Sequence, residues 1–510
     1  MSANAVSSIF VPGDMLAIAL GADELVKELQ KQTKDRNISI EIIRNGSRGM
    51  CWAETLLEVQ TNAGRVAYGN VKASDVNSLF AADFLNGGKH EKSLGLTEDI
   101  PWLTEQERVI FNRCGIIDPL SLEEFQDSGG FAGLRKALQM SPVQIVEQVT
   151  KSGLRGRGGA GFPTGIKWQT VLDTTGAVKH IVCNADEGDS GTFSDRLIME
   201  GDPFRLIEGM VIAGLAVGAE QGVIYLRSEY PFAVKMMRAA IEIAVAESWL
   251  GGNIQGSGKT FDMEVFVGAG SYVCGEETAL LESLEGKTGI VRSKPPLPAI
   301  AGLFGQPTVI NNVITLCAVP DILAKGGDWH ASLGIGRSTG TLPFQLAGNV
   351  AKGGLVELPF GASLQELVSD FAGGTKDGSK IRAVQVGGPL GAYLPPELFD
   401  TLTGYEEFAS IGAGIGHGGI VIYGSSINMR EQAKYAFEFC AEESCGKCTP
   451  CRIGSIRGYE LLGAEQIDKS LIDDLCEVMI EGSACAMGAM TPIPVQSAMR
   501  YWPEDFKGKS

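Results

Sequence analysis

The sequence has too little positive charge for a protein that binds nucleic acids or a membrane surface. Its 510 residues include 43 Lys and Arg against 61 Asp and Glu, which gives a formal net charge of −18. Such a surface repels nucleic-acid phosphates and anionic lipids, and this excludes non-specific binding to either. Disorder throughout the chain is also excluded, because 44% of the residues are hydrophobic and only 20% are charged.

An export signal and a long apolar run are also missing. The first residues, MSANAVSSIFVPGDM, contain no basic segment and no apolar core, so we expect a cytoplasmic protein. The longest uncharged stretch, 409–429, is interrupted by six glycines and by His417. It therefore predicts glycine-rich turns and one buried strand, without direct membrane insertion.

Histidine is scarce, and familiar nucleotide-binding motifs are absent. The four histidines, at positions 90, 180, 330 and 417, lie far apart and suggest no metal site or triad, so ordinary surface or core positions are expected. The GSGKT at 256–260 lacks the first glycine of an ATP loop and precedes a strand-like run. The Gly414-x-Gly416-x-x-Gly419 pattern comes before an apolar run instead of after one, so we predict a turn.

What is present is the pattern of an α/β multidomain protein. The length suggests about three domains of ~150 residues. Short apolar runs alternate with helical patterns between about 136 and 335, which predicts an open, largely parallel sheet. Between about 340 and 425 strands recur with Gly and Pro turns, and after 429 the pattern is helical almost to the end. The first 90 residues predict a small α/β domain, followed by a polar linker that carries Cys114.

The cysteines include a cluster with metal-binding spacing. Cys445, Cys448 and Cys451 form C-x2-C-x2-C, and Cys485 lies 34 residues downstream. Three close cysteines and one remote one are the usual arrangement for a [4Fe–4S] cluster. Structural zinc is the alternative, although zinc sites more often use two separated pairs. Cys476 is expected to be a buried thiol outside the site.

A glycine-rich segment suggests an anion-binding loop. Residues 153–168, GLRGRGGAGFPTGIKW, contain six glycines, two arginines and Lys167. Glycines allow backbone N–H groups to approach a phosphate closely. A flexible surface loop is the alternative. Two further loops, CNADEGDSGTF and GAGSYVCGEET, follow predicted strands, where an α/β sheet presents its ligand crevice.

In this order, these segments resemble the NADH-binding flavoprotein subunit of respiratory complex I and its soluble relatives in NAD-reducing hydrogenases and NAD-dependent formate dehydrogenases. The likeness runs from about 136 to 500 and also includes RSKPPLPA, PTVINNV, ESCGKCTPCRIG and SACAMG. It implies a Rossmann-like FMN- and NAD-binding domain at 136–338 and a β-grasp (soluble ligand-binding) domain at 339–428. A helical bundle with a [4Fe–4S] cluster would occupy 429–510.

The resemblance implies roles for the residues of the matching motifs, with FMN, NAD and a [4Fe–4S] cluster as cofactors. The FMN site would be formed by Gly156, Gly158, Gly159, Lys167, Asn184, Asp186, Glu187, Asn311 and Asn312. The NAD pocket would be lined by Phe162, Glu276, Glu277 and Lys294, with Tyr272 and Gly275 in the same loop. The cluster ligands would be Cys445, Cys448, Cys451 and Cys485. No catalytic acid–base residue is expected, since hydride and electron transfer need none.

The first 90 residues resemble the thioredoxin-like [2Fe–2S] subunit that accompanies this flavoprotein. Only Cys51, and in the linker at 91–135 Cys114, remain of its four-cysteine set, and two thiols cannot complete the site. We therefore predict a cluster-free thioredoxin-like domain that serves as a docking surface. Such a chain looks most like the diaphorase (beta) subunit of a molybdenum-containing, NAD-dependent formate dehydrogenase.

The expected function is therefore electron transfer between NAD(H) and the cluster through FMN, within a hetero-oligomer. The expected partners are a molybdenum-containing formate-oxidising subunit and a small thioredoxin-like [2Fe–2S] subunit. The diaphorase subunit of an NAD-reducing hydrogenase, or of complex I, is the nearest alternative. A zinc-stabilised scaffold without catalytic activity is the alternative from a different class.

Overall fold

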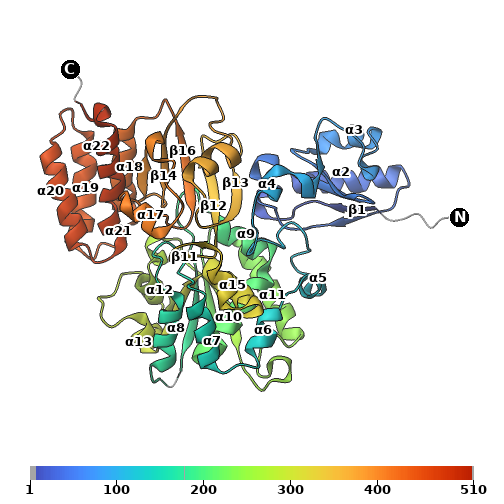
Figure 1. The fold of residues 1–510 in the computed structure, drawn as a ribbon, viewed down its shortest axis with the longest axis horizontal. Helices are drawn as coiled ribbons and strands as arrows, with labels where there is room; N and C mark the ends of the chain where they lie inside the picture. Colours follow the sequence, from blue (N-terminus) through green and yellow to red (C-terminus); the bar gives the residue numbers. More distant parts are fainter. Residues whose placement is uncertain (1–6, 177, 508–510) are drawn as a thin grey trace.

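The computed structural model describes residues 7–176 and 178–507. Figure 1 shows three layered units and a terminal group of helices. The N-terminal unit extends to one side, in blue, and the C-terminal helices lie at the opposite end, in red. A mixed sheet, in orange, stands between them above a parallel sheet and its helices.

The N-terminal unit is a five-stranded sheet of order β2-β1-β3-β4-β5. β1 and β2 are parallel, and the other neighbours are antiparallel. Helix α2 buries Leu25 and Leu29 in the core of this unit. The strands are β1 Ser7–Phe10, β2 Ile40–Ile43, β3 Leu57–Thr61, β4 Gly64–Tyr68 and β5 Ser93–Leu96, and the helices are α1 Met15–Ala19, α2 Ala22–Asp35 and α3 Val76–Ala81.

The polar linker predicted at 91–135 is wrong. β5 lies inside that range and forms the edge of the first sheet beside β4. Phe111, Phe125 and Phe131 are fully buried in the same core as the parallel sheet. These few aromatic side chains anchor an otherwise polar stretch, because each buries a large apolar surface. The helices of this stretch are α4 Pro101–Thr104, α5 Leu122–Asp127 and α6 Ala132–Ala137.

The parallel sheet expected from the alternating pattern is present, with strand order β8-β7-β6-β9. Helix α10 is buried along almost its whole length, which fits its largely apolar sequence. The strands are β6 His180–Ala185, β7 Gln221–Leu226, β8 Asp262–Val267 and β9 Thr308–Asn312. The helices are α7 Pro142–Lys151, α8 Thr164–Asp173, α9 Ser194–Gly201, α10 Pro203–Val217, α11 Pro231–Ala246, α12 Glu277–Leu284, α13 Pro298–Ala301, α14 Val313–Lys325 and α15 Gly327–Ala331.

The mixed sheet has the order β13-β12-β16-β14-β15, with β12 and β16 parallel and the other pairs antiparallel. Turns at 411–418 precede β16, as the glycine pattern predicts. The strands are β12 Thr341–Gly348, β13 Gly354–Pro359, β14 Ile381–Val386, β15 Ala392–Leu394 and β16 Gly419–Gly424. Helices α16 Leu364–Glu366 and α17 Tyr405–Ser410 and a short two-stranded sheet, β10 Gly334–Ile335 with β11 Ser338–Thr339, complete this region.

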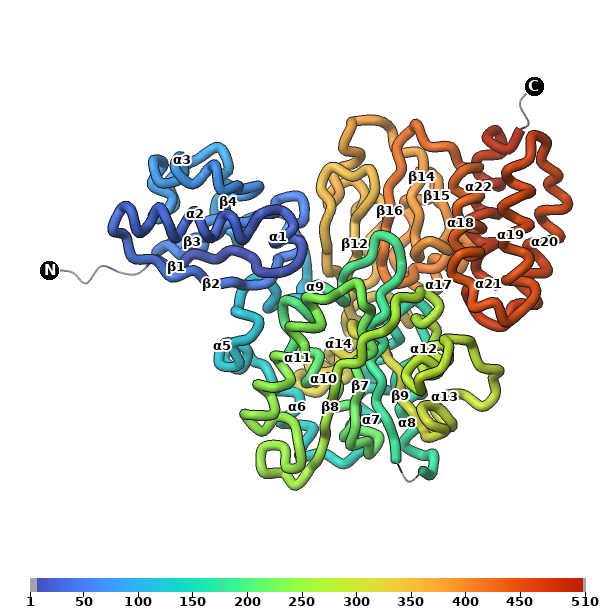
Figure 2. The backbone as a smooth tube through the Cα atoms, turned by 180° about the vertical axis from the view of Figure 1, so that it is seen from behind, coloured from blue at the N-terminus to red at the C-terminus, as the bar shows by residue number. Residues whose placement is uncertain are grey.

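The chain ends in helices packed side by side, as both views show (Figures 1 and 2). α18 packs against α19 and α22, and Phe437 and Met479 are buried among them. The helices are α18 Met429–Glu443, α19 Thr449–Gly463, α20 Lys469–Gly482, α21 Ala486–Met490 and α22 Pro492–Tyr501. Within the described ranges, no helix has both the length and the apolar character needed to cross a bilayer.

Candidate functional site

The glycine-rich loop folds back on itself just before α8. The backbone N–H of Gly156 donates to the carbonyl of Phe162 at 2.8 Å, which closes the loop. A Cβ on Gly158 would lie 2.9 Å from the Cβ of Asn312, closer than real Cβ atoms approach. Gly159 has a φ of +109°, a conformation that side-chain-bearing residues rarely adopt. The glycines thus let the loop lie directly against the end of β9.

The two amides at the strand ends lie next to each other in the sheet. Asn184, on β6, is paired in register with Asn312, the last residue of β9. The Asn184 amide donates to the carbonyl of Gly275 at 2.8 Å, and the Asn312 side chain caps α14 by accepting from Ile314 N–H at 2.9 Å. Asn311 is turned inward, where its Oδ1 accepts from Trp168 Nε1 at 2.8 Å. The structure therefore brings together Gly158, Asn184 and Asn312. Asn311 points away from them, toward Trp168.

Asp186 offers an unused acceptor at this edge. Its Oδ2 is buried and has no hydrogen-bond partner among the described residues. Burial raises the pKa of Asp186 to about 7, and the nearby Arg227 guanidinium opposes this rise. A buried acceptor without a donor is costly unless a ligand supplies one. Asp186 and the glycine cradle therefore fit a bound flavin that carries both a phosphate and ring N–H groups.

A group of charged side chains lies on the loops beside the cradle. Lys294 Nζ lies 2.9 Å from Glu276 Oε1 and 2.7 Å from Glu277 Oε1. Lys167 Nζ donates to the carbonyl of Ile310 at 2.8 Å and lies 3.9 Å from Glu277 Oε2. Burial lowers the pKa of Lys167, although Glu277 opposes this. Half of the Phe162 side chain is exposed, so its ring is available to a ligand.

Glu187 is not free to meet a flavin with its carboxylate. Its Oε1 accepts from the Asp195 backbone N–H at 3.1 Å, and its Oε2 accepts from the Tyr230 hydroxyl at 3.1 Å. It also lies beside His417, for which the sequence predicts an ordinary position. Residues 187 and 417 are too far apart in the chain for any spacing signal to connect them. The Glu187 carboxylate is therefore held by protein groups, and contact of Glu187 with the flavin stays a prediction.

The four motif cysteines lie on two neighbouring loops of the terminal helices. Cys445 and Cys448 lie between α18 and α19, Cys451 is in the first turn of α19, and Cys485 directly precedes α21. The backbone N–H of Ala484 donates to Cys448 Sγ at 3.4 Å, which joins the two loops. A fifth thiol that the motif does not include, Cys440, has its Sγ 3.6 Å from that of Cys451.

The positions of these sulfurs bear on the choice between a cluster and a zinc ion. A zinc ion with four thiolates at ~2.3 Å holds the sulfurs about 3.8 Å apart. Among the described residues, only Glu187, Asp195 and His417 form a group of three or more whose ligand atoms all lie within 4.8 Å. Among the described residues, no three of the motif sulfurs therefore lie within 4.8 Å of one another, and the [4Fe–4S] cluster remains the interpretation that their spacing in the sequence favours. Cys476 is fully buried, as expected.

Two family models match the chain. The Nuo51 FMN-binding domain covers residues 149–321, and the NADH-ubiquinone oxidoreductase-F iron-sulfur binding region covers 431–509. Among curated relatives, the NADP-reducing hydrogenase subunit HndC of Solidesulfovibrio fructosivorans is 44% identical over 79% of this chain and 83% of its own length. The F subunit of the NADH-quinone oxidoreductase of Escherichia coli is 42% identical over 76% and 89%.

A solved structure is similar over nearly the whole chain. The NAD⁺-reducing [NiFe]-hydrogenase in the air-oxidised state contains a chain that is 28% identical, with a TM-score of 0.69. The alignment covers 99% of this chain and 85% of that one.

Fold, flavin cradle and cysteine set together define an oxidoreductase subunit that uses a flavin and an iron–sulfur cluster. The chain belongs to the family of the NADH-quinone oxidoreductase F subunits. Its cofactors are FMN, a [4Fe–4S] cluster and NAD. The residues assigned to each cofactor stay predictions.

Proposed function

We propose that the chain is a diaphorase subunit that passes electrons between NAD(H) and its [4Fe–4S] cluster through FMN, in the cytoplasm. When bound, FMN exchanges an electron pair with nicotinamide and single electrons with the cluster. The backbone N–H groups of Gly158 and Gly159 hold the phosphate, and Asp186 accepts from the flavin ring. Phe162 and the Glu276–Glu277–Lys294 group hold the dinucleotide beside it. Four cysteines hold the cluster.

One residue, Tyr272, carries this proposal, since its contacts join the flavin loops to the cluster helices. The backbone N–H of Tyr272 donates to Glu443 Oε2 at 3.0 Å, and its ring meets Phe439 edge-on at 4.8 Å between centroids. The Tyr272 hydroxyl donates to Asp189 Oδ1 at 2.8 Å, on the loop that follows β6. Glu443 is the last residue of α18, two positions before Cys445. Tyr272 thus connects the loops assigned to the nucleotides directly with the helices assigned to the cluster.

For the electron donor, we propose formate, oxidised in a molybdenum-containing partner subunit, so that this subunit reduces NAD⁺. Supporting this, the N-terminal unit lacks a cluster-binding cysteine set, and we propose this unit as a thioredoxin-like docking surface for a small [2Fe–2S] subunit. A second candidate donor is hydrogen. The aligned chain in the NAD⁺-reducing [NiFe]-hydrogenase covers 99% of this chain, so a fused N-terminal unit does not by itself favour formate.

The electron exit is tested with Cys448→Ala, compared with Cys476→Ala as a buried thiol outside the motif. Under anaerobic conditions NADH should still bleach the flavin of Cys448→Ala, while the electron paramagnetic resonance signal of the reduced cluster and electron delivery to an iron–sulfur partner are lost. Cys476→Ala should retain both. A Cys448→Ala protein that keeps FMN but cannot be reduced by NADH would contradict the proposed order of carriers. Colourless wild-type protein with stoichiometric zinc would favour the scaffold alternative.

The electron donor is tested by analysing the metals of the complex that co-purifies with this chain. Stoichiometric molybdenum, with formate-dependent reduction of NAD⁺, is the expected result. Nickel with hydrogen-dependent reduction would replace formate by the second candidate and leave the diaphorase function intact.

A further inference from the structure

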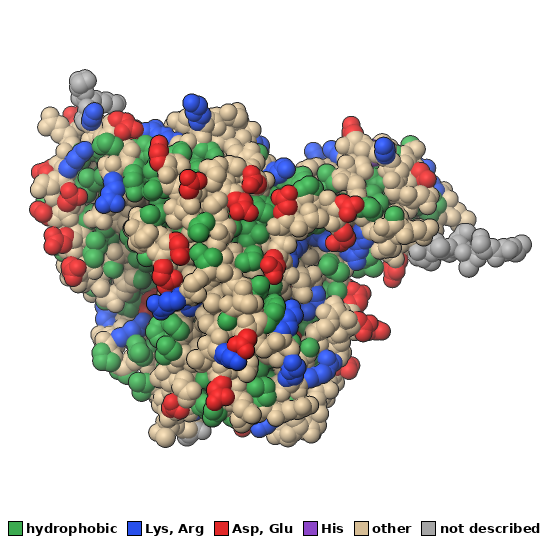
Figure 3. All heavy atoms as spheres, viewed as in Figure 1, with side chains coloured by type: hydrophobic (Ala, Val, Ile, Leu, Met, Phe, Trp, Pro, Cys, Tyr) green, Lys and Arg blue, Asp and Glu red, His purple; other side chains and the backbone are tan. Residues whose placement is uncertain are grey.

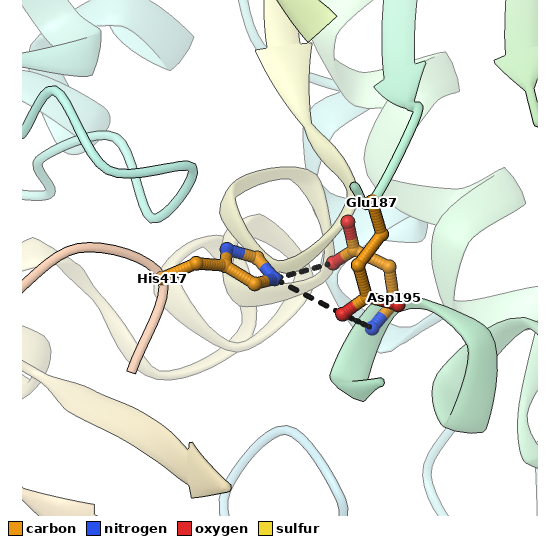
Figure 4. A group of neighbouring side chains, drawn as sticks. All are labelled: Glu187, Asp195 and His417. Carbon is orange, nitrogen blue, oxygen red and sulfur yellow. Dashed lines mark hydrogen bonds and ion pairs between the residues drawn. The ribbon is translucent and has the colours of Figure 1, made fainter. Parts of the chain in front are cut away.

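A buried histidine that no proposed electron-transfer step uses lies where the flavin loops meet the mixed sheet. His417 belongs to the glycine-rich turn just before β16, and 5% of it is exposed. Figure 4 shows its ring directed between the carboxylates of Glu187 and Asp195. Nε2 lies 3.4 Å from Glu187 Oε1 and 3.2 Å from Asp195 Oδ1, and both carboxylates are buried.

The hydrogen bonds of the ring fix its protonation. His417 Nδ1 lies 2.6 Å from the carbonyl oxygen of Arg157, and a carbonyl can only accept, so Nδ1 carries a proton. Nε2 faces two carboxylate oxygens and, at 3.0 Å, the Ser194 hydroxyl. A neutral ring would turn its lone pair toward the two carboxylates. The two buried carboxylates beside Nε2 favour a proton on this nitrogen too, which makes the ring an imidazolium.

The surrounding charges agree with this assignment. Burial alone would lower the pKa of His417, but Asp195 and Glu187 outweigh it and raise the pKa well above its usual value. Asp189, on the same loop as Glu187, is the next carboxylate near enough to interact with it. The Arg157 side chain faces away, with its guanidinium donating to the carbonyl of Thr339 at 2.6 Å. His417, Glu187 and Asp195 thus form a buried ion-pair group of one cation and two anions.

The same hydrogen bonds connect three loops that form the flavin cradle. Arg157, whose carbonyl His417 holds, directly precedes Gly158. Asp195 Oδ2 accepts from Asn312 Nδ2 at 2.7 Å, and the Cβ of Asn312 fills the space left by the missing side chain of Gly158. Glu187 lies on the loop after β6, and Asp195 lies in the first turn of α9 that follows this loop. One charged ring therefore touches, directly or through one residue, the loop at 156–159, the segment after β6 and the end of β9.

We propose that His417 is a positioning residue for the FMN site, which holds these three segments together through a permanent imidazolium charge. This rests on the proposed function, because the segments are assigned to FMN there. The residue itself need not touch the flavin. Its loss leaves two buried carboxylates facing each other, so the segments separate and the cradle loosens.

The test compares FMN dissociation constants of purified full-length variants by recovery of flavin fluorescence on dilution. His417→Gln should weaken FMN binding at least tenfold, because two carboxylates lose their shared cation. Adding Asp195→Asn removes one of those carboxylates and should recover most of the lost FMN affinity. A purely steric role of His417 would not predict this recovery. His330→Gln should bind within twofold of wild type. His330 is equally buried, and its Nδ1 bonds to the Ser152 carbonyl at 2.9 Å, but it forms no ion pair among the described residues.

Wild-type affinity in His417→Gln, or no rescue in the double variant, would overturn the proposal. Should His417→Gln fail to fold, the charge is measured in the wild-type chain labelled with ¹³C-histidine, whose four ring signals are assigned by substitution. One signal should stay at the imidazolium position from pH 6.5 to 8.5, whereas a neutral His417 at pH 8 overturns the proposal. A stoichiometric divalent cation lost in His417→Gln would also overturn it, since a metal would then occupy the place of the Nε2 proton. The charge measurement does not depend on FMN, so failure of the proposed function would appear separately as wild-type protein that binds no FMN.

Discussion

Individual buried carboxyl groups give this chain a stability that depends on pH. Glu54, in the N-terminal unit, is buried, and its oxygens accept from Ser47 Oγ at 2.7 Å and Leu56 N–H at 2.9 Å. Burial, with the neighbouring Asp14 carboxylate adding to it, raises the pKa of Glu54 to about 8. The folded state therefore holds a proton that the unfolded chain releases near pH 4.5. Stability falls as the pH rises from about 4.5 to about 8.

Replacing Glu54 by Gln should remove this loss. The oxygen of an uncharged glutamine can accept from the Leu56 N–H while its amide donates to Ser47 Oγ. At pH 8 we therefore expect Glu54→Gln to unfold about 2–4 °C higher for each ~1 kcal/mol recovered. The fall of the melting temperature between pH 5 and 8 should be shallower than in wild type. Differential scanning calorimetry at several pH values measures both. Glu41→Gln, a substitution of an exposed residue in the same sheet, is the control. Identical pH slopes for wild type and Glu54→Gln would refute the raised pKa of Glu54.

At the scale of elements, the helices that hold the cluster depend on glycines for close approach. Gly458, in the middle of α19, faces Phe437 of α18, and a Cβ there would overlap the aromatic ring. Gly463, at the end of the same helix, is exposed and has only Lys434 Cε within reach, at 3.7 Å. The two glycines share the helix but differ in packing.

Gly458→Ala should therefore destabilise and Gly463→Ala should not. Alanine favours a helix by up to ~1 kcal/mol over glycine, but a methyl group forced into the Phe437 ring costs about 1–3 kcal/mol. We expect a lower melting temperature and reduced iron content for Gly458→Ala, because α19 also carries Cys451. Gly463→Ala should match or exceed wild type. Equal behaviour of the two variants would show that α18 and α19 do not pack this closely.

At the scale of the whole molecule, the N-terminal unit is docked on the parallel-sheet unit and does not hang free. The backbone N–H of Met15 donates to Glu200 Oε2 at 2.9 Å, and Asn45 Nδ2 donates to the carbonyl of Gly115 at 2.6 Å. Gly46 lies so close to Gly201 that a Cβ would come within 2.7 Å of its Cα. In Figure 3 the N-terminal unit extends to one side, but Met50, Ala53, Leu56 and Ala67 share a buried core with the mixed sheet. A side chain added at Gly46 should therefore disturb the contact with Gly201, while the core shared with the mixed sheet keeps the unit attached.

Gly46→Ala should loosen this docking while leaving both units folded. We expect faster hydrogen exchange at 108–117 and around Gly201. Gly252→Ala, with open space around it and no left-handed backbone, should change neither. Unchanged exchange in Gly46→Ala would mean that the contact with Gly201 does not hold the unit in place.

Local patterns determined much of this molecule. The alternation of apolar runs and helical patterns predicts the parallel sheet, the glycine-rich turns predict the loop before β16, and the spacing of the cysteines predicts one shared site on the terminal helices. These features depend on residues near each other in the chain or on motifs long enough to be specific. The strand-end position of Asn184 and Asn312 follows in the same way from parallel strands ending at one edge.

Only the tertiary structure decided what distant residues do together. In the folded chain, residues 91–135 belong to the core and to the first sheet, although the stretch is polar in composition. The burial of a few aromatic side chains stabilises this arrangement, while the many polar side chains remain solvated. The tertiary structure also turned Glu187 toward His417, which lies 230 positions away in the sequence, and placed Cys440 beside Cys451. Charge pairing and burial act through space, so neither the imidazolium between two carboxylates nor its link to the flavin loops could be found before the chain was folded.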